Sequence, residues 1–182
     1  AREAGATVLV LDRASGPGGT SGIAGGHLYL GGGTPVQQAC GFDDTPEDMY
    51  RYLEALTPDP APEKLRLYCE GSVAHFHWLE ANGVPFDRSY YPHKATMQPG
   101  RECLIWSGNE KAWPFRELAK PAPRGHKVAF DGPDGGGALL RGRFESLRPA
   151  SPCESAAGAA ACVWCSLSGA GAKPSIVAKC RV

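Results

Sequence analysis

The stretch from Ala6 to Gly26, ATVLVLDRASGPGGTSGIAGG, decides the fold of this chain. It begins with a short apolar run, Thr7–Leu11, which is rich in β-branched residues and is followed by Asp12. Continuous apolar runs of this length are typical of parallel strands that are buried on both faces. The run therefore predicts a central strand with an acidic residue at its carboxyl end, as in an α/β fold.

Glycine dominates the segment that follows this strand. Nine of the eighteen residues from Gly16 to Gly33 are glycine. Because glycine loses more backbone entropy on folding than other residues, this density indicates positive φ angles or a close approach of the backbone to a ligand. Free backbone N–H groups in such a loop form a cradle for an anion. A short strand is expected at His27–Leu30, a run without glycine between Gly26 and Gly31.

A strand, an acid at its tip and a glycine-rich loop form the second half of a dinucleotide-binding βαβ unit, in which the acid binds a ribose diol. The G-x-G-x-x-G motif and the first strand of such a unit are absent, and would precede Ala1. We therefore expect an α/β fold with a partial Rossmann-like domain, from a trimmed or fragmentary chain. The alternative is a strand that ends in a solvated Asp beside a loop that is merely flexible.

Two helices are expected as an insertion after this loop. The first begins at Asp44 or Thr45, which can cap it, with Pro46 in its first turn. The second runs from about Glu63 to Asn82, carries an apolar stripe at helical spacing and stops at Gly83. Two further elements are expected, a strand at Glu102–Trp106 and a single helical turn at Ala138–Leu140 that does not continue.

Charge and composition divide the chain near residue 140. The whole chain has 19 basic and 19 acidic residues, which argues against a nucleic-acid partner or a polybasic membrane surface. No apolar run approaches the ~18 residues that span a bilayer. Residues 1–140 carry 13 basic and 17 acidic side chains (net −4), whereas residues 141–182 carry 6 and 2 (net +4). We predict one domain over 1–140 and an irregular tail over 141–182, either frameshifted or disordered, or else an ordinary Ala-rich end.

The chain has seven cysteines, and their number alone does not settle the compartment, although the separated ones are typical of a cytoplasmic protein. Three of them, Cys40, Cys69 and Cys103, are widely separated and are expected to be free, buried thiols. Cys162 and Cys165 have the C-x-x-C spacing of a metal site, and Cys180 could add a third ligand, but a fourth is missing. A metal-binding protein is therefore a minor alternative, and no metal site is predicted.

Three segments carry a resemblance to a known family. Residues 6–26 resemble the stretch after the first Rossmann helix in the FAD-dependent fumarate reductase/3-ketosteroid dehydrogenase superfamily. The segment Trp78–Phe86 is similar to the W-L-x-x-x-G-V-x-F pattern that follows the family's long helix. SGNEKAWPFRELAKPAPRGH (Ser107–His126) looks closest to the Δ4-(5α)-type 3-ketosteroid dehydrogenase branch. The resemblance covers about residues 1–140.

The resemblance implies FAD as cofactor and assigns residues to it. Asp12 would hold the adenosine ribose, and small residues of the loop would line the pyrophosphate and the flavin ring. In relatives that bind the flavin covalently through a His, that His precedes the Thr/Ser pair, where this chain has Gly19, so the FAD is expected to be non-covalent. The implied cofactor residues of the loop are Gly18, Gly19, Thr20, Ser21, Gly25 and Gly26.

The same resemblance implies an oxidoreductase that forms or reduces a C–C double bond beside a carbonyl, with a steroid ketone or a dicarboxylate as substrate. The family's proton-donating residues lie downstream of this chain, so no catalytic residue is assigned and the electron acceptor stays open. His126 is a candidate polar contact for the substrate, with its pKa lowered by the charges of Arg124 and Lys127; a solvent-exposed loop His is the alternative. His27 is either a flavin partner or structural. A non-catalytic remnant or interaction protein is the rival function.

Overall fold

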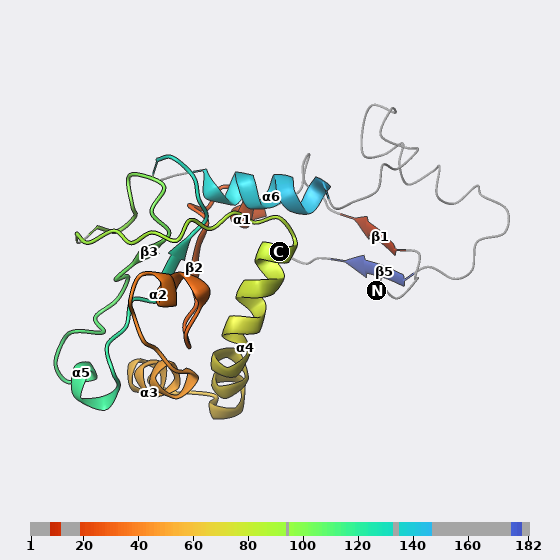
Figure 1. The fold of residues 1–182 in the computed structure, drawn as a ribbon. Helices are drawn as coiled ribbons and strands as arrows, with labels where there is room; N and C mark the ends of the chain where they lie inside the picture. Colours follow the sequence, from red (N-terminus) through yellow and green to blue (C-terminus); the bar gives the residue numbers. More distant parts are fainter. Residues whose placement is uncertain (1–7, 12–18, 94, 133–134, 147–175, 180–182) are drawn as a thin grey trace, which may run out of the picture.

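The computed structural model describes residues 8–11, 19–93, 95–132, 135–146 and 176–179 (Figure 1). A three-stranded antiparallel sheet has the order β2-β4-β3, and β1 and β5 form a separate parallel pair. Helices α2, α3 and α4 lie between β2 and β3 in the sequence, as the expected helical insertion does. The elements are β1 (Val8–Leu11), α1 (Gly19–Gly22), β2 (His27–Tyr29), α2 (Pro35–Ala39), α3 (Pro46–Leu56), α4 (Pro62–Ala81), β3 (Leu104–Ile105), α5 (Phe115–Leu118), β4 (Gly125–Lys127), α6 (Gly136–Ser146) and β5 (Ile176–Lys179).

The main hydrophobic core forms where α4 covers the three-stranded sheet. In the sheet, His126 of the central strand β4 is in register with Leu28 of β2 and Leu104 of β3. Phe76 and Leu79 of α4 are buried in this core. Each such fully buried apolar side chain stabilises the fold by roughly 1.5–3 kcal/mol. The buried members of the cluster are Leu30, Val36, Phe76, Leu79, Val84, Phe86, Cys103, Leu104, Val128 and Ala129.

The two long helices begin and end where local chemistry predicts. Thr45 caps α3, since its Oγ1 accepts a hydrogen bond from the Asp48 backbone N–H at 3.0 Å. Gly83 follows α4 with a φ of +79°, a left-handed conformation that favours glycine at the end of a helix. The predicted strand at His27–Leu30 is also confirmed as β2. Cys40, Cys69 and Cys103 are free as expected; Cys69 and Cys103 are buried, whereas Cys40 is only half-buried, contrary to the prediction.

Two expected elements differ from the observed ones. The strand at Glu102–Trp106 shortens to Leu104–Ile105, because its pairing with β4 ends at Gly125, next to the proline-containing segment before it. The single turn expected at Ala138–Leu140 was wrong, since α6 continues to Ser146 and crosses the expected boundary at residue 140.

The strand predicted at Thr7–Leu11 is present as β1, and it pairs in parallel with β5, with Val8 opposite Ile176. Among the described residues β5 is its one partner, so the expected central position stays a prediction. The rest of the tail predicted over 141–182, apart from β5 and the end of α6, lies outside the described residues. Within the described part of the chain, no helix has the length and hydropathy that a bilayer crossing requires.

Candidate functional site

The loop expected to bind the cofactor presents an open outer surface of small residues. We call residues 19–26 the cofactor loop; it contains α1. Gly19 has a φ of +47° and open space where a Cβ would be, and the side chains of Thr20 and Ser21 are exposed. Ile23 is 85% exposed. Two free hydroxyls beside an uncovered apolar side chain fit a ligand with both phosphate and ring surfaces, as FAD has. Asp12 and Gly18 lie outside the described residues.

The inner side of the cofactor loop packs against the start of α6. Gly26 is buried with a φ of +75°, and a Cβ there would lie 2.7 Å from the Gly136 Cα. The Gly26 carbonyl also accepts a hydrogen bond of 3.3 Å from the Val128 backbone N–H. Packing is therefore sufficient to explain why glycine occupies position 26. The role of Gly25 and Gly26 toward the cofactor stays a prediction.

His126 lies in the core of the protein rather than in a solvent-exposed loop. Its side chain is fully buried in β4, and its ring meets the Phe76 ring edge-on, with 5.7 Å between the centroids. Burial lowers the pKa of His126 to about 4. The cause that we expected, repulsion by Arg124 and Lys127, is therefore wrong. In this conformation a substrate does not reach His126.

Hydrogen bonds fix the protonation state of this histidine. The His126 Nδ1 lies 3.0 Å from the Arg124 carbonyl oxygen, which can only accept, so Nδ1 carries the proton and donates a hydrogen bond to that oxygen. Its Nε2, 2.8 Å from the Thr34 Oγ1, then accepts from that hydroxyl. The Thr34 oxygen in turn accepts from the Gln37 backbone N–H at 3.3 Å. The neutral imidazole thus links β4 to the start of α2.

A buried ion pair lies next to His126. Arg124 binds Asp44 through two hydrogen bonds, Nη2 to Oδ1 at 2.7 Å and Nε to Oδ2 at 3.0 Å, and neither side chain is exposed. Asp44 also accepts from the Gly32 backbone N–H at 2.9 Å and from the Gln37 Nε2 at 3.0 Å. Paired hydrogen bonds of this kind satisfy charges that would otherwise be costly to bury. The pair ties the loop before α3 to the entry of β4.

Gln37 completes this network. Its amide nitrogen donates to the Asp44 carboxylate and to the Pro123 carbonyl at 2.8 Å, and its amide oxygen accepts from the backbone N–H groups of Gly33 (3.1 Å) and Thr34 (2.9 Å). All hydrogen-bonding positions of the amide are therefore used. Sequence reasoning missed Asp44, Gln37 and Arg124 as a cluster, because each has an ordinary local explanation: a helix cap, a helical polar residue and a loop cation.

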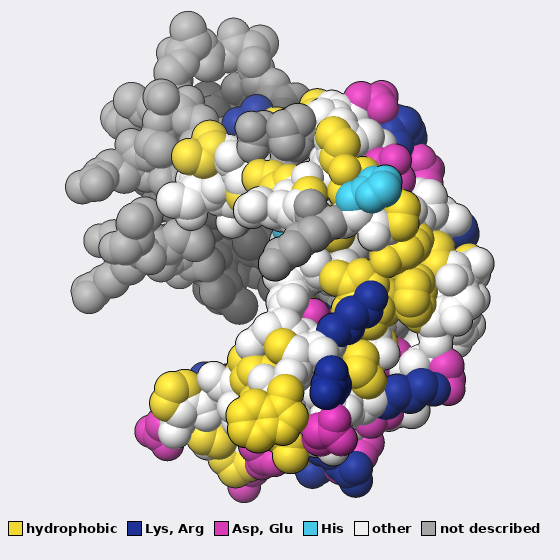
Figure 2. Space-filling view, turned by 90° about the vertical axis from the view of Figure 1, so that its left-hand side faces the viewer, with side chains coloured by type: hydrophobic (Ala, Val, Ile, Leu, Met, Phe, Trp, Pro, Cys, Tyr) yellow, Lys and Arg dark blue, Asp and Glu magenta, His cyan; other side chains and the backbone are white. Residues whose placement is uncertain are grey.

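The side of the molecule with β3 and α5 carries hydrophobic side chains interspersed with Lys and Arg (Figure 2). A surface pocket of about 450 Å³ there is lined by Pro92, His93, Trp106, Gly108, Asn109, Lys111 and Ala112. The Lys111 Nζ lies 3.9 Å from the Trp106 ring centroid, and the Trp106 Nε1 donates to the Tyr90 hydroxyl at 2.8 Å. Trp106 lines this pocket, whereas Trp113 is 75% exposed and is not among the residues that line it.

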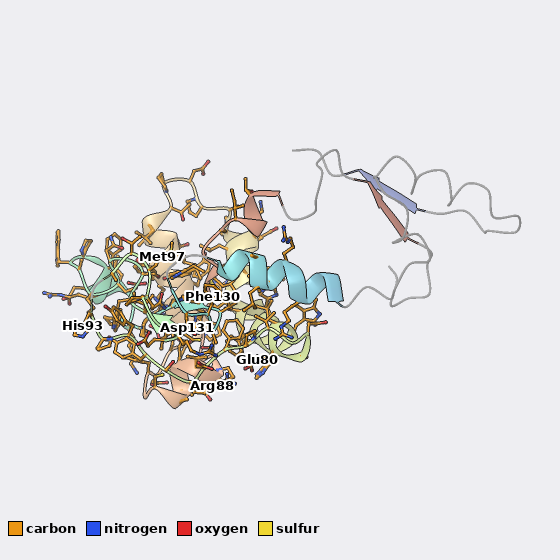
Figure 3. The ribbon with its side chains drawn as sticks, turned by 90° about the horizontal axis from the view of Figure 1, so that it is seen from above. Glu80, Arg88, His93, Met97, Phe130 and Asp131 are labelled. Carbon is orange, nitrogen blue, oxygen red and sulfur yellow. The ribbon has the colours of Figure 1, made fainter. Side chains whose placement is uncertain are left out.

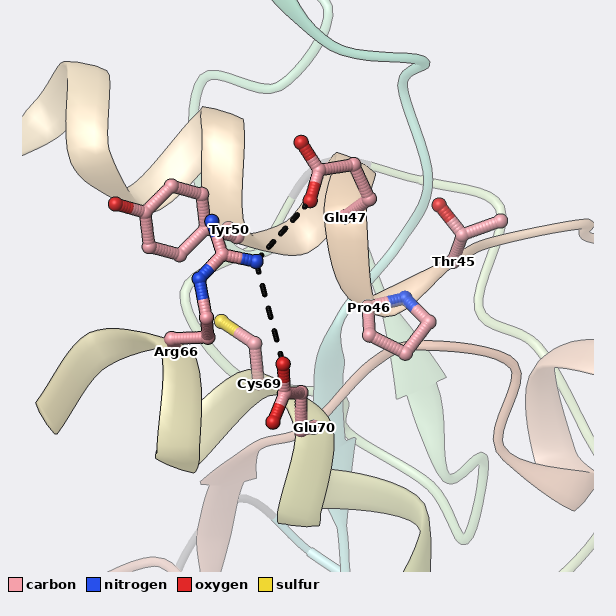
Figure 4. A pocket seen from close by; sticks show the side chains of 7 residues that line it. All are labelled: Thr45, Pro46, Glu47, Tyr50, Arg66, Cys69 and Glu70. Carbon is pink, nitrogen blue, oxygen red and sulfur yellow. Dashed lines mark hydrogen bonds and ion pairs between the residues drawn. The ribbon is translucent and has the colours of Figure 1, made fainter. Parts of the chain in front are cut away.

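A second pocket, of about 270 Å³, lies between α3 and α4 (Figure 4). Arg66 lies over the Tyr50 ring at 4.2 Å and pairs with Glu47 at 3.4 Å and Glu70 at 4.0 Å. Burial raises the pKa of the adjacent Cys69 thiol to about 11, which leaves it protonated and weakly nucleophilic. Both carboxylates of this pocket pair with Arg66 and its thiol is protonated, so the pocket offers no activated nucleophile.

A buried lysine, Lys127, joins the loop before β3 to the loop after β4. The Lys127 Nζ donates to the carbonyl oxygens of Gln98 (3.0 Å), Gly100 (2.5 Å) and Gly132 (2.7 Å). Figure 3 shows Phe130 and Asp131 in this region beside the start of α6. Among the described residues, no group of three or more His, Cys, Asp or Glu side chains could hold a metal ion. The cysteines of the expected minor metal alternative, Cys162, Cys165 and Cys180, lie outside them.

Comparisons with known proteins agree on one family. A family profile described as "FAD binding domain" matches residues 1–171. The chain is 34% identical over 139 residues to a 3-oxo-5-alpha-steroid 4-dehydrogenase from Comamonas testosteroni, covering 74% of this chain and 26% of that protein. It is 34% identical over 102 residues to a 3-oxosteroid 1-dehydrogenase from Rhodococcus opacus, covering 53% and 20%.

A solved structure is similar to most of this chain. It is the crystal structure of a 3-ketosteroid-Δ4-(5α)-dehydrogenase from Rhodococcus jostii in complex with 4-androstene-3,17-dione. The two match with a TM-score of 0.76 and 49% sequence identity, over 79% of this chain and 31% of the other. The chain therefore spans less than a third of the length of each of these three relatives.

Proposed function

Because this chain belongs to the FAD binding domain family, in the 3-ketosteroid dehydrogenase-like branch of the FAD-dependent oxidoreductases, we propose that its cofactor loop binds FAD non-covalently as part of a ketosteroid dehydrogenase. The single observation that carries this proposal is the match to the steroid-bound Rhodococcus jostii enzyme at 49% identity. FAD is the cofactor of this family, and when bound it supplies the hydride acceptor for oxidation of a C–C bond.

The chain's own residues would bind and orient the cofactor. The hydroxyls of Thr20 and Ser21 are free to donate to phosphate or flavin oxygens, and Gly19 leaves the backbone uncovered. Asp12, which follows β1 in the sequence, completes the proposed set together with Gly18, Gly25 and Gly26. No residue of the chain is assigned to proton transfer.

The proposed substrate class is a 3-ketosteroid rather than a dicarboxylate. The two steroid-dehydrogenase relatives and the ligand of the Rhodococcus jostii structure favour it. His126, which we had considered as a polar contact for either substrate, is fully buried, so we assign it no contact with the substrate.

The test is a titration of the purified chain with FAD, followed by flavin fluorescence and the visible absorption bands. Saturable binding is expected, and trichloroacetic acid should release all of the flavin into the supernatant, because no covalent bond holds it. Ser21→Ala should weaken binding, whereas Thr96→Val, at an exposed position outside the loop, should not. A chain that binds no FAD would refute the proposal and favour a non-catalytic protein.

A second titration addresses the substrate class. If the FAD-loaded chain binds 4-androstene-3,17-dione, the flavin bands should shift, while fumarate should leave them unchanged. The reverse result would assign the chain to the dicarboxylate side of the superfamily.

A further inference from the structure

The start of α6 lies so close to the backbone of the cofactor loop that only glycine fits at its first two positions. A Cβ on Gly137 would lie 2.2 Å from the Ser21 carbonyl oxygen and 2.5 Å from the Ala24 carbonyl oxygen. A Cβ on Gly136 would lie 2.4 Å from the Gly25 carbonyl oxygen. All three partners are backbone atoms, so a rotamer change cannot relieve the overlap. The loop itself would have to move.

A hydrogen bond fixes this contact as well. The Gly137 N–H donates to the Ala24 carbonyl at 2.8 Å. The first N–H groups of a helix have no partner within the helix, so a loop carbonyl at this distance satisfies one of them. The helix start and the cofactor loop are thus joined by sterics and by a hydrogen bond at the same place.

We propose that Gly136 and Gly137 are positioning residues for FAD: they let α6 support the cofactor loop from behind and hold its outer face in the binding conformation. This inference rests on the proposed function, since it concerns the same loop. Phosphate and ring contacts demand a fixed loop geometry, so a displaced loop binds less well even though no residue that touches FAD has changed.

The chain offers two matched controls. Gly142 lies in the same helix, and a Cβ there would meet nothing within 4 Å. Gly125 lies in β4, where a Cβ would come within 2.7 Å of the Ser107 Cβ and 2.9 Å of the Ile105 Cγ2, away from the cofactor loop. Gly142→Ala therefore tests helix propensity alone, which favours alanine, and Gly125→Ala tests overpacking alone.

The experiment measures FAD affinity by fluorescence titration of the full chain and, without FAD, hydrogen–deuterium exchange of a peptide that covers residues 19–28. Gly137→Ala and Gly136→Ala should each weaken FAD binding by about tenfold or more and speed exchange in that peptide. Gly142→Ala and Gly125→Ala should bind within about twofold of the wild type, although Gly125→Ala should unfold at a lower temperature.

Each result has a distinct meaning. If the wild type binds FAD and the four variants bind it equally, the positioning role is wrong and the proposed function stands. If Gly125→Ala loses as much affinity as Gly137→Ala, general destabilisation explains the effect and the inference fails. If the wild type binds no FAD, both the proposed function and this inference are wrong. Should Gly137→Ala not fold, Gly136→Ala decides by the same criteria.

Discussion

Asp43 and Asp44 are neighbours in the chain, and each pairs with a cation, yet their surroundings differ completely. Asp44 and Arg124 are fully buried, whereas Asp43 and Lys120 form a 2.5 Å pair at the surface, with side-chain exposures of 82% and 54%. Water already solvates the surface charges, so their pairing adds little. A buried charge that loses its partner is left without solvent or counter-charge, which is far more costly.

This contrast yields a prediction. Asp44→Ala should lower the free energy of unfolding by about 3–5 kcal/mol, because Arg124 is left buried and unpaired. Asp43→Ala, the matched surface variant, should change it by less than about 1 kcal/mol. Urea unfolding followed by circular dichroism measures both. Equal effects of the two substitutions would show that the Arg124 pair is hydrated or exchangeable in solution.

His126 makes the stability of the protein depend on pH. Its pKa is lowered to about 4 in the folded state, against about 6.5 in an unfolded chain. Between these values the unfolded state binds more protons, so the free energy of unfolding must fall as the pH falls from 6.5 towards 4. From pH 7 to pH 5 the expected loss is on the order of 2 kcal/mol.

The test compares the wild type with His126→Gln, which cannot titrate but can still donate to and accept from the neighbours of His126. The variant should lose less stability between pH 7 and pH 5 than the wild type, whatever its stability at pH 7. Urea unfolding at the two pH values gives the difference. Identical pH slopes for the two proteins would show that His126 titrates normally and is not sealed in the core.

At the scale of the element, the helices follow from their own sequence. Thr45, Pro46 and the acids of the first turn specify the start of α3, and Gly83 specifies the end of α4, because caps depend on residues within a few positions of one another. Thr45→Ala should therefore cost about 1 kcal/mol of stability and Thr45→Ser much less, since serine keeps the hydroxyl. Thermal unfolding would measure this, and an equal loss in both variants would assign the effect to the lost methyl group.

The strands and the buried histidine were harder to predict, for a physical reason. The segment around His126 contains Arg124 and Lys127, and such a charged stretch ordinarily lies at the surface. It is buried because its charges find partners far along the chain: Asp44 is 80 residues from Arg124, and the carbonyls that bind Lys127 include that of Gln98. No local pattern reports such partners. The length of β3 similarly depends on β4, not on its own residues.

At the scale of the whole molecule, distant segments meet around the cofactor loop. The loop follows β1 in the sequence, and the glycines that support it belong to α6, more than 100 residues later; α1 and α6 nevertheless lie side by side (Figure 1). The glycines of the loop suggested a ligand from the sequence alone, whereas its support by Gly136 and Gly137 required the structure. The conformation of the cofactor loop thus depends on the packing of α6, because Gly136 and Gly137 contact the loop only when α6 is in place.

Coupling of this kind predicts how FAD should stabilise the whole chain. A ligand that binds only the folded state adds RT ln(1 + [FAD]/Kd), or about 2.7 kcal/mol at a hundredfold excess over Kd. The unfolding temperature should therefore rise steadily with FAD concentration in thermal scans. Riboflavin, which lacks the pyrophosphate and the adenylate, should give a much smaller rise at equal concentration, because the loop would hold the missing groups.

The Asp44→Ala variant separates ligand binding from core stability. Its unfolding temperature without FAD should be low, yet FAD should add the same free energy as in the wild type, because sites without shared contacts contribute additively. A Gly137→Ala variant that binds FAD tenfold more weakly should keep only about half of the FAD-dependent increment at the same FAD concentration. If riboflavin stabilises the chain as well as FAD does, the phosphates are not held by the cofactor loop, and the site must be sought elsewhere on the molecule.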